Sequence, residues 1–212
     1  MPSRLQNARG LYLITPDFDD TNQLLSLTER LLQGPPALLQ YRNKAADTAL
    51  RRHQAEALLR LCRQAGVPLI INDDWQLAHQ IGADGVHLGE FDADPADIRK
   101  IMGDDALIGV SCYNDIERAR RMSRLDVDYL AFGAVFPSPT KPLAPQAPLH
   151  LFAEARALGK PTVAIGGIRP DNSAQLHDAG ADFIAVISGV FDAPDPVAAL
   201  IAYNHSFSKV IP

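Results

Sequence analysis

The chain has 212 residues, of which 47% are hydrophobic and 21% charged, as in an ordinary globular domain. Its net charge of −5 argues against a general surface for nucleic acid or anionic membrane, so any phosphate binding must be local. We expect a soluble cytoplasmic protein, because no apolar run reaches the ~20 residues of a membrane span, no signal peptide precedes the first strand, and Cys62 and Cys112 lack metal-ligand spacing.

Short apolar runs recur along the chain and predict strands buried on both faces, which is typical of parallel sheets. The predicted strands cover residues 11–15, 37–42, 68–73, 85–89, 107–112, 128–133, 161–167 and 183–188. Amphipathic runs predict helices at 21–34, 48–66, 74–82, 94–102, 114–124, 148–159, 170–179 and 194–206. Asp94 with Pro95, and also Pro170, are helix-start signals, whereas Gly34 and Gly66 can end helices.

Strands and helices in this alternation predict the α/β class and a single (β/α)8 TIM-barrel domain over 1–212. We expect residues 1–10 to form an N-terminal extension and 207–212 a C-terminal tail. The alternative is an open doubly wound sheet, but its glycine-rich first turn is missing from the segment LITPDFDD. Asp84, Asp128 and Asp182 each precede a strand in a weak internal repeat, so we expect them to stabilise the bottom of the barrel.

Polar residues at the carboxyl ends of the strands mark the candidate site, because a TIM barrel carries its chemistry there. The second strand runs into QYRNK, where Gln40, Arg42 and Lys44 alternate and share one face as long as the chain stays extended. Two cations at the barrel mouth indicate an anion site. The alternative is a surface arginine followed by a solvated lysine.

Two aspartates follow neighbouring strands and predict a metal site. Asp73 ends the third strand, and Asp92 follows the fourth by a few residues. Adjacent strands lie ~4.8 Å apart, so the two carboxylates can converge on an octahedral Mg²⁺ that keeps several waters. The alternative is that Asp73 caps the helix at 74–82 and Asp92 belongs to a turn.

The fifth strand ends in GVSC, which presents Ser111 as a hydrogen-bond donor to substrate. A nucleophilic role for Ser111 or Cys112 is not favoured, because neither an elbow motif nor a suitably placed base accompanies them. His87 lies in the middle of a strand and is interpreted as a satisfied core histidine.

Glycines and a serine after the last two strands predict a second, smaller anion site. Gly167 lies in IGGI, and Ser188 begins a short helix after VI. The alternative is that these residues only form tight turns. With Lys141 added to the first zone, the two zones suit a diphosphate with its metal and a monophosphate.

The segments LYLITP, LLQYRNK, LIINDD, ADGVHLGEFD, GVSC, DYLAFGAVFPSPTK, VAIGGI and GADFIAVIS follow in this order and cover nearly the whole chain. With these motifs the chain closely resembles the thiamine-phosphate synthase family, also called thiamine-phosphate pyrophosphorylases. The resemblance implies a transferase that couples 4-amino-5-hydroxymethyl-2-methylpyrimidine diphosphate with 4-methyl-5-(2-phosphooxyethyl)thiazole, giving thiamine phosphate and diphosphate. It also implies a dissociative, Mg²⁺-assisted substitution, in which diphosphate leaves before the thiazole nitrogen adds.

The resemblance assigns the site residues one by one. Catalytic roles fall on Arg42, Lys44, Ser111 and Lys141, and the Mg²⁺ ligands are Asp73 and Asp92. Contacts to the pyrimidine diphosphate fall on Gln40, Tyr41, Arg42, Asn43, Lys44, Asn72, Ser111 and Lys141. Contacts to the thiazole phosphate fall on Ser138, Pro139, Thr140, Gly167, Ile187 and Ser188. These two small molecules are the expected partners of a monomer or small homo-oligomer.

The chain departs from the common family pattern at Glu90, Tyr113 and Ser138, where glutamine, histidine and threonine are frequent. A thiazole tautomerase paralogue would carry that histidine and would not need the aspartate pair. A non-catalytic precursor-binding paralogue is the other alternative. Pro137, Pro139 and Pro142 predict a stiff loop that holds Lys141 at the site, whereas Pro145 and Pro148 lead the chain to the next helix.

Overall fold

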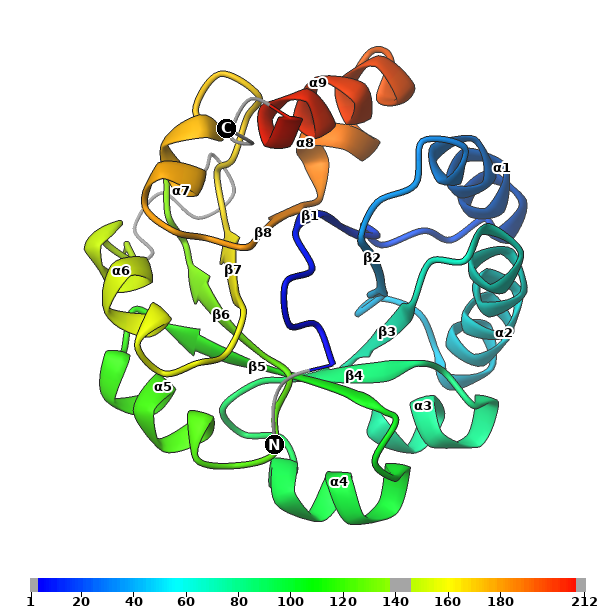
Figure 1. The fold of residues 1–212 in the computed structure, drawn as a ribbon. Coiled ribbons are helices and arrows are strands. Elements are labelled where there is room, and N and C mark those ends of the chain that lie inside the picture. Colours follow the sequence, from blue (N-terminus) through cyan, green and yellow to red (C-terminus); the bar gives the residue numbers. More distant parts are fainter. Residues whose placement is uncertain (1–3, 138–145, 209–212) are drawn as a thin grey trace.

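The computed structural model describes residues 4–137 and 146–208, and its parallel strands close into a barrel in sequence order (Figure 1). The described strands are β1 (Gly10–Ile14), β2 (Leu38–Tyr41), β3 (Leu69–Asn72), β4 (Gly85–Leu88), β5 (Leu107–Tyr113), β6 (Tyr129–Gly133), β7 (Thr162–Ile165) and β8 (Phe183–Val186). The barrel closes where β1 pairs with β8, with Tyr12 opposite Ala185. The predicted single-domain TIM barrel is therefore confirmed, and the open sheet is wrong.

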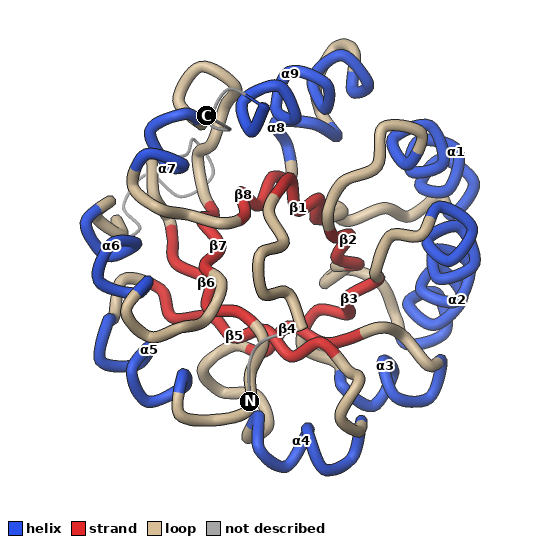
Figure 2. The backbone as a smooth tube through the Cα atoms, viewed as in Figure 1, coloured by secondary structure: helices blue, strands red, loops and turns tan. Residues whose placement is uncertain are grey.

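Helices surround the barrel on its outside (Figure 2). Those described are α1 (Thr21–Leu32), α2 (Thr48–Ala65), α3 (Trp75–Ile81), α4 (Pro95–Met102), α5 (Ile116–Ser123), α6 (His150–Arg156), α7 (Ala174–Asp178), α8 (Ser188–Phe191) and α9 (Pro196–Ser208). The predicted helix at 170–179 starts late, because Asn172 accepts a hydrogen bond from the Arg169 amide and closes a turn there. No helix in the described ranges is both apolar enough and long enough to span a bilayer.

The buried apolar residues form two clusters, one inside the barrel and one between the strands and the helices. The inner cluster includes Tyr12, Leu38, Tyr129 and Phe183 from the strands, together with Leu5 from the N-terminal segment. The outer cluster lies between the strands and the helices and is rich in leucine, isoleucine and valine. Strands of a TIM barrel bury both faces, which explains their nearly continuous apolar sequences.

The three aspartates of the internal repeat lie at the bottom of the barrel, as predicted. Asp84 accepts a hydrogen bond from the Leu69 amide at 2.8 Å, and Asp182 accepts one from the Thr162 amide at 2.9 Å. Asp128 does the same for the Ile108 amide at 2.9 Å. Each carboxylate thus ties the start of one strand to the strand before it.

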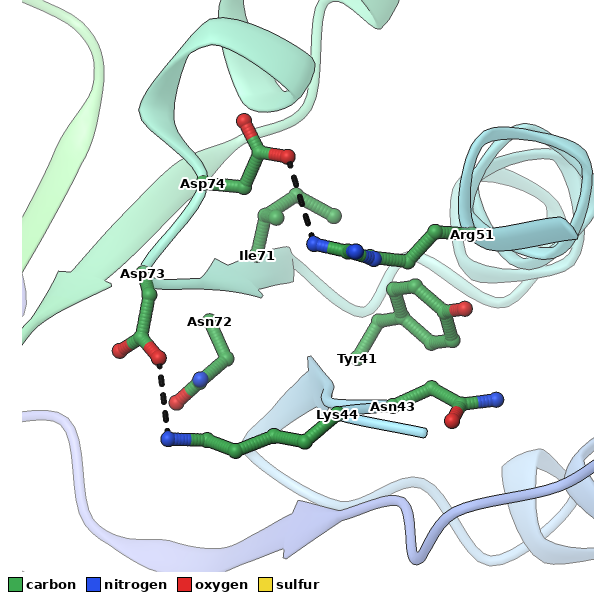
Figure 3. A pocket seen from close by; sticks show the side chains of 8 residues that line it. All are labelled: Tyr41, Asn43, Lys44, Arg51, Ile71, Asn72, Asp73 and Asp74. Carbon is green, nitrogen blue, oxygen red and sulfur yellow. Dashed lines mark ion pairs between the residues drawn. The ribbon is translucent and has the colours of Figure 1, made fainter. Parts of the chain in front are cut away.

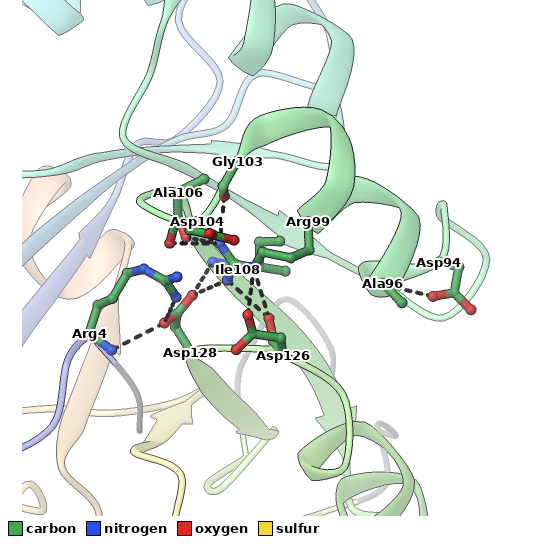
Figure 4. A network of polar contacts seen from close by, with 10 residues as sticks. All are labelled: Arg4, Asp94, Ala96, Arg99, Gly103, Asp104, Ala106, Ile108, Asp126 and Asp128. Atoms are coloured by element: carbon green, nitrogen blue, oxygen red, sulfur yellow. Dashed lines mark hydrogen bonds and ion pairs between the residues drawn. The ribbon is translucent and has the colours of Figure 1, made fainter. Parts of the chain in front are cut away.

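Asp128 also forms the centre of a charged network at the bottom (Figure 4). Its carboxylate lies 2.8 Å from Arg99 Nη2 and 3.0 Å from Arg4 Nη1. Arg99 is buried and donates further to the carbonyl oxygen of Ala106 at 2.6 Å. Buried charges of opposite sign with this many hydrogen bonds are satisfied, so the network has a structural role.

Candidate active site

The carboxyl ends of β2 and β3 form one side of the barrel mouth. β2 ends at Tyr41, so Gln40 still points into the barrel, whereas Arg42 and Lys44 lie on the loop beyond. Gln40 is buried, and its Nε2 donates to Tyr12 Oη at 2.8 Å. Arg42 Nη1 lies 3.0 Å from Asp17 Oδ1. The shared face was predicted for a strand that continues through Lys44, and β2 ends at Tyr41.

Tyr41 and Asn43 use their polar atoms within the fold. Tyr41 Oη donates to Gln54 Oε1 at 2.8 Å, and Asn43 Nδ2 donates to the Phe18 carbonyl oxygen at 2.7 Å. Burial raises the pKa of Tyr41 well above its usual value, so the phenol remains protonated. These side chains fix the loop that carries the two cations.

A small open pocket lies between this loop and the end of β3 (Figure 3). Lys44 Nζ lies 3.2 Å from Asp73 Oδ2 across the pocket, and Arg51 Nη1 lies 3.9 Å from Asp74 Oδ2. The lining side chains are Tyr41, Asn43, Lys44, Arg51, Ile71, Asn72, Asp73 and Asp74. Five of the predicted site residues therefore meet in one place, on the side of the mouth formed by β2 and β3.

Three pocket residues were not predicted as site residues, namely Arg51, Ile71 and Asp74, and Arg51 is the one that adds a cation. It lies in the first turns of α2, and adjacent arginines at the start of a helix predict a solvent-exposed face. In the structure its Nη2 donates to the Ala46 carbonyl oxygen at 3.2 Å, and its buried Nε has no partner among the described residues. The sequence does place Arg51 about one helical turn after the loop that follows β2, and this position lies near the barrel mouth.

Asp73 and Asp74 have different tasks, although they are adjacent. Asp74 caps α3 by accepting from the Leu77 amide at 2.9 Å. Asp73 has a φ of 62°, a left-handed conformation that aspartate tolerates better than most residues. The alternative that Asp73 caps this helix is therefore wrong.

Asp73 contacts the end of β4 through its backbone amide, and Asp92 contacts it through its carboxylate. The Asp73 amide donates to the His87 carbonyl oxygen at 2.8 Å, and the Gly89 amide, two residues further along, donates to Asp92 Oδ2 at 2.6 Å. In the described part of the chain no cluster of three or more His, Cys, Asp or Glu side chains could hold a metal. A pair of hard oxygen ligands fits Mg²⁺, which is commonly bound by one or two carboxylates together with waters and substrate phosphates.

Ser111 lies at the end of β5, within reach of His87. Ser111 Oγ is 2.9 Å from His87 Nε2, and His87 Nδ1 is 3.1 Å from Tyr129 Oη. Burial lowers the pKa of His87 to about 4, although the charge of Asp92 opposes the shift, so the imidazole is neutral at pH 7. Both ring nitrogens of His87 thus have a partner, as expected for a satisfied histidine, although its side chain is only partly buried.

Cys112 follows Ser111 and is buried as a free thiol. Burial raises the pKa of the Cys112 thiol to about 12, so almost no thiolate exists at neutral pH. The same cause raises the pKa of Cys62 to about 12. Neither cysteine is therefore a nucleophile.

The ends of β7 and β8 form the second part of the mouth. Gly167 has a φ of 64°, and a Cβ there would lie 2.6 Å from the carbonyl oxygens of both Phe136 and Pro137. Ile187 immediately precedes α8, and Ser188 is exposed at its first position. The β7 loop thus contacts the start of the proline-rich segment.

The proline-rich segment itself is only partly described. Ser138, Pro139, Thr140 and Lys141, all predicted site residues, lie outside the described residues. Its base is described, because the Ala147 amide donates to the Ala134 carbonyl oxygen at 2.8 Å. Of the departures from the family pattern, Tyr113 Oη accepts from the Glu90 amide at 3.2 Å and so connects the loops after β5 and β4.

The family model and the relatives that share 29% or more of their sequence with this chain agree with one another. The family model described as thiamine monophosphate synthase matches residues 11–190. A thiamine-phosphate synthase from Xanthomonas campestris pv. campestris (strain 8004) is 57% identical over 99% of this chain and 100% of its own. One from Azoarcus sp. (strain BH72) is 54% identical over 96% of this chain and 99% of its own. The solved thiamine phosphate pyrophosphorylase from Pyrococcus furiosus has a TM-score of 0.86 and 29% identity, covering 99% of this chain and 100% of that one.

Proposed function

The chain belongs to the thiamine monophosphate synthase family, and from this premise we propose how it acts as a thiamine-phosphate synthase, a transferase of thiamine biosynthesis. It joins 4-amino-5-hydroxymethyl-2-methylpyrimidine diphosphate to 4-methyl-5-(2-phosphooxyethyl)thiazole and releases diphosphate. The thiazole tautomerase and non-catalytic alternatives are not favoured, because relatives at 54–57% identity over nearly the whole chain are named thiamine-phosphate synthases.

The observation that carries the proposal is the pocket in which Lys44 and Arg51 face Asp73 and Asp74. We place the diphosphate there, with Lys44, Arg42 and Arg51 supplying positive charge. Asp73 and Asp92 would hold Mg²⁺, which when bound supplies charge neutralisation of the leaving diphosphate. Asn72 and Ser111 would bind the pyrimidine, and Gln40 would support it from inside the barrel.

Residues of this chain contribute mainly by positioning and by electrostatics. As the C–O bond to diphosphate breaks, negative charge grows on the leaving group, and the cations held by the β2 loop stabilise it. No described side chain at the mouth is an obvious strong base, which suits a dissociative substitution. The thiazole nitrogen then adds to the pyrimidine methylene carbon, and alignment of the two substrates lowers the entropic part of the barrier.

The thiazole phosphate is proposed to bind at Gly167, Ile187 and Ser188. Support comes from the left-handed Gly167, whose missing side chain lets the β7 loop contact the start of the proline-rich segment. Ser138, Pro139, Thr140 and Lys141 follow in that segment and are proposed to complete the site. A cytoplasmic location is part of the proposal and is supported by two free, buried thiols.

The deciding experiment supplies purified protein with both substrates and follows thiamine phosphate formation with and without Mg²⁺. We expect product only when Mg²⁺ is present. Undiminished turnover in excess chelator would remove the metal from the proposal but leave the transferase activity. Absence of product under all conditions would overturn the proposed function itself.

A further inference from the structure

A continuous row of hydrogen bonds crosses the inside of the barrel and ends at Ser111. It begins with Gln40 on β2, whose Nε2 donates to Tyr12 Oη at 2.8 Å. Tyr12 Oη lies 2.7 Å from Tyr129 Oη, and Tyr129 Oη lies 3.1 Å from His87 Nδ1. His87 Nε2 then lies 2.9 Å from Ser111 Oγ. Five strands thus contribute polar groups to a core that is otherwise largely apolar.

The rings in this row are packed so that their polar atoms have no freedom to find other partners. Tyr129 stacks on His87 with ring centroids 5.6 Å apart and an interplanar angle of 15°. Tyr12 meets Tyr129 edge-on at 5.8 Å and 89°. Space for the Tyr129 ring exists only because residue 109 is glycine, since a Cβ at Gly109 would lie 1.8 Å from the ring.

Counting hydrogens gives the row a direction. Tyr12 accepts from Gln40, so its single hydrogen is available for Tyr129, and the hydrogen of Tyr129 is then available for His87 Nδ1. A neutral imidazole that accepts at Nδ1 carries its hydrogen on Nε2 and donates it to Ser111 Oγ. The Ser111 hydrogen is therefore left free to point away from His87.

The opposite order of donors and acceptors leaves one more buried hydrogen without an acceptor among the described residues. If Ser111 donated to His87 and His87 donated to Tyr129, then Tyr12 would accept from both Tyr129 and Gln40. The Tyr12 hydrogen would then have no acceptor in the part of the chain that the structure describes. A buried donor without a partner is costly, so the first order is preferred.

We propose that Tyr129 and His87, with Tyr12 behind them, are positioning residues that hold the Ser111 hydroxyl as a hydrogen-bond donor toward the barrel mouth. Its acceptor is a lone-pair atom of the pyrimidine diphosphate, which rests on the proposed function because Ser111 meets substrate only there. The neutral row keeps this donor fixed before substrate arrives, so no reorganisation is needed during the reaction.

Nitrogen NMR of the free protein labelled at its 6 histidines tests the direction without any substrate. The signals of His87 are those that disappear in His87→Gln. We expect a protonated Nε2 and an unprotonated Nδ1 in the wild type and in Tyr12→Phe, where Tyr129 can still donate. In Tyr129→Phe we expect the proton to be shared between both nitrogens. A His87 protonated at Nδ1 in the wild type would overturn the proposal.

Kinetics with the same variants test the consequence. Tyr129→Phe should lower kcat about tenfold, as expected for one misdirected hydrogen bond, whereas Tyr12→Phe should lower it less than about threefold. In a Ser111→Ala background, Tyr129→Phe should have no further effect, because its effect passes through Ser111. Equal losses with and without Ser111 would show a merely structural role and overturn the proposal. Failure of the wild type to form any product would instead refute the proposed function, and the NMR result would still decide the direction.

Discussion

Lys44 Nζ lies 3.2 Å from Asp73 Oδ2, so an ion pair joins the loops after β2 and β3 across the pocket. The two partners are the proposed diphosphate cation and a proposed Mg²⁺ ligand. Both are well exposed, so the pair itself contributes little to stability. In the proposed mechanism, a metal and a diphosphate replace these internal partners when the substrate binds.

Asp73→Asn should abolish Mg²⁺-dependent coupling while leaving the fold intact, because asparagine also tolerates the left-handed conformation at this position. The measurement is initial rate against Mg²⁺ concentration, with circular dichroism as a check of folding. Asp74→Asn is the matched control, since Asp74 caps α3 and pairs with Arg51. It should leave the free energy of unfolding nearly unchanged, because asparagine caps a helix about as well as aspartate, and it should keep the Mg²⁺ requirement. Activity in Asp73→Asn equal to that of the control would contradict the metal assignment.

Arg51→Gln should raise the KM for the pyrimidine diphosphate about tenfold, because it removes a cation from the diphosphate pocket. Its neighbour provides a control: Arg52 is half-exposed and pairs with Glu56 at 2.9 Å on the outer face of α2. Arg52→Gln should leave both KM and kcat unchanged. Steady-state kinetics at saturating thiazole phosphate measure the KM for the pyrimidine diphosphate in both variants. An unchanged KM in Arg51→Gln would exclude Arg51 from substrate binding.

Asp128→Ala should lower the free energy of unfolding by about 3–5 kcal/mol, since it removes the carboxylate nearest to buried Arg99 and the acceptor of the buried Ile108 amide. Asp182→Ala is a milder change of the same kind, because the Asp182 side chain is 26% exposed and water can replace its contacts. We expect a loss of about 1 kcal/mol there. Urea unfolding measures both, and equal losses would contradict the importance given to burial.

Gly167→Ala should destabilise the protein by about 2–3 kcal/mol and raise the KM for the thiazole phosphate, because the new Cβ collides with two carbonyl oxygens. Gly159→Ala controls for conformation alone, since Gly159 has a φ of 69° and open space around it. It should cost about 1 kcal/mol and leave the kinetics unchanged. Thermal unfolding and KM measurements on both variants check this, and a normal KM in Gly167→Ala would remove the β7 loop from the phosphate site.

Acidification should destabilise the free protein through His87. Its pKa is about 4 in the folded state and near 6.5 in an unfolded chain, so only the unfolded chain takes up a proton between these values. The stability contributed by neutral His87 is thus present above pH 6.5 and is lost as the pH falls toward 4, by about 3 kcal/mol. Unfolding free energies at pH 7.5 and 4.5 should differ less in His87→Gln than in the exposed control His79→Gln. Equal differences would contradict the buried, neutral state of His87.

Much of the fold follows from local patterns in the sequence. All eight strands among the described residues lie within a residue or two of the predicted ranges, because a strand buried on both faces must be apolar along its length. The aspartates at the bottom were predicted for a similar reason, since their spacing follows the strand–helix repeat. Asp73 was found from its position just after a strand.

Other features depend on where distant residues meet, and local patterns do not show them. Tyr12 reads as part of an apolar strand, yet its hydroxyl meets that of Tyr129, 117 positions away. The need for Gly109 is visible only once the Tyr129 ring is placed inside the barrel. The sequence predicts Arg51 to be a solvent-exposed helix residue, because helical periodicity does not show that α2 begins beside the barrel mouth. The end of β2 at Tyr41 likewise depends on the contacts of the following loop.

The aspartates at the bottom of the barrel have a consequence for how this protein can change over generations. The carboxylates that join the strands lie at the end opposite the loops that are proposed to bind substrate. Most substitutions in the mouth loops therefore leave the strand connections intact, and a chain with altered loops still folds. Variation in substrate preference is accessible at one end of the molecule, while the other end tolerates little change.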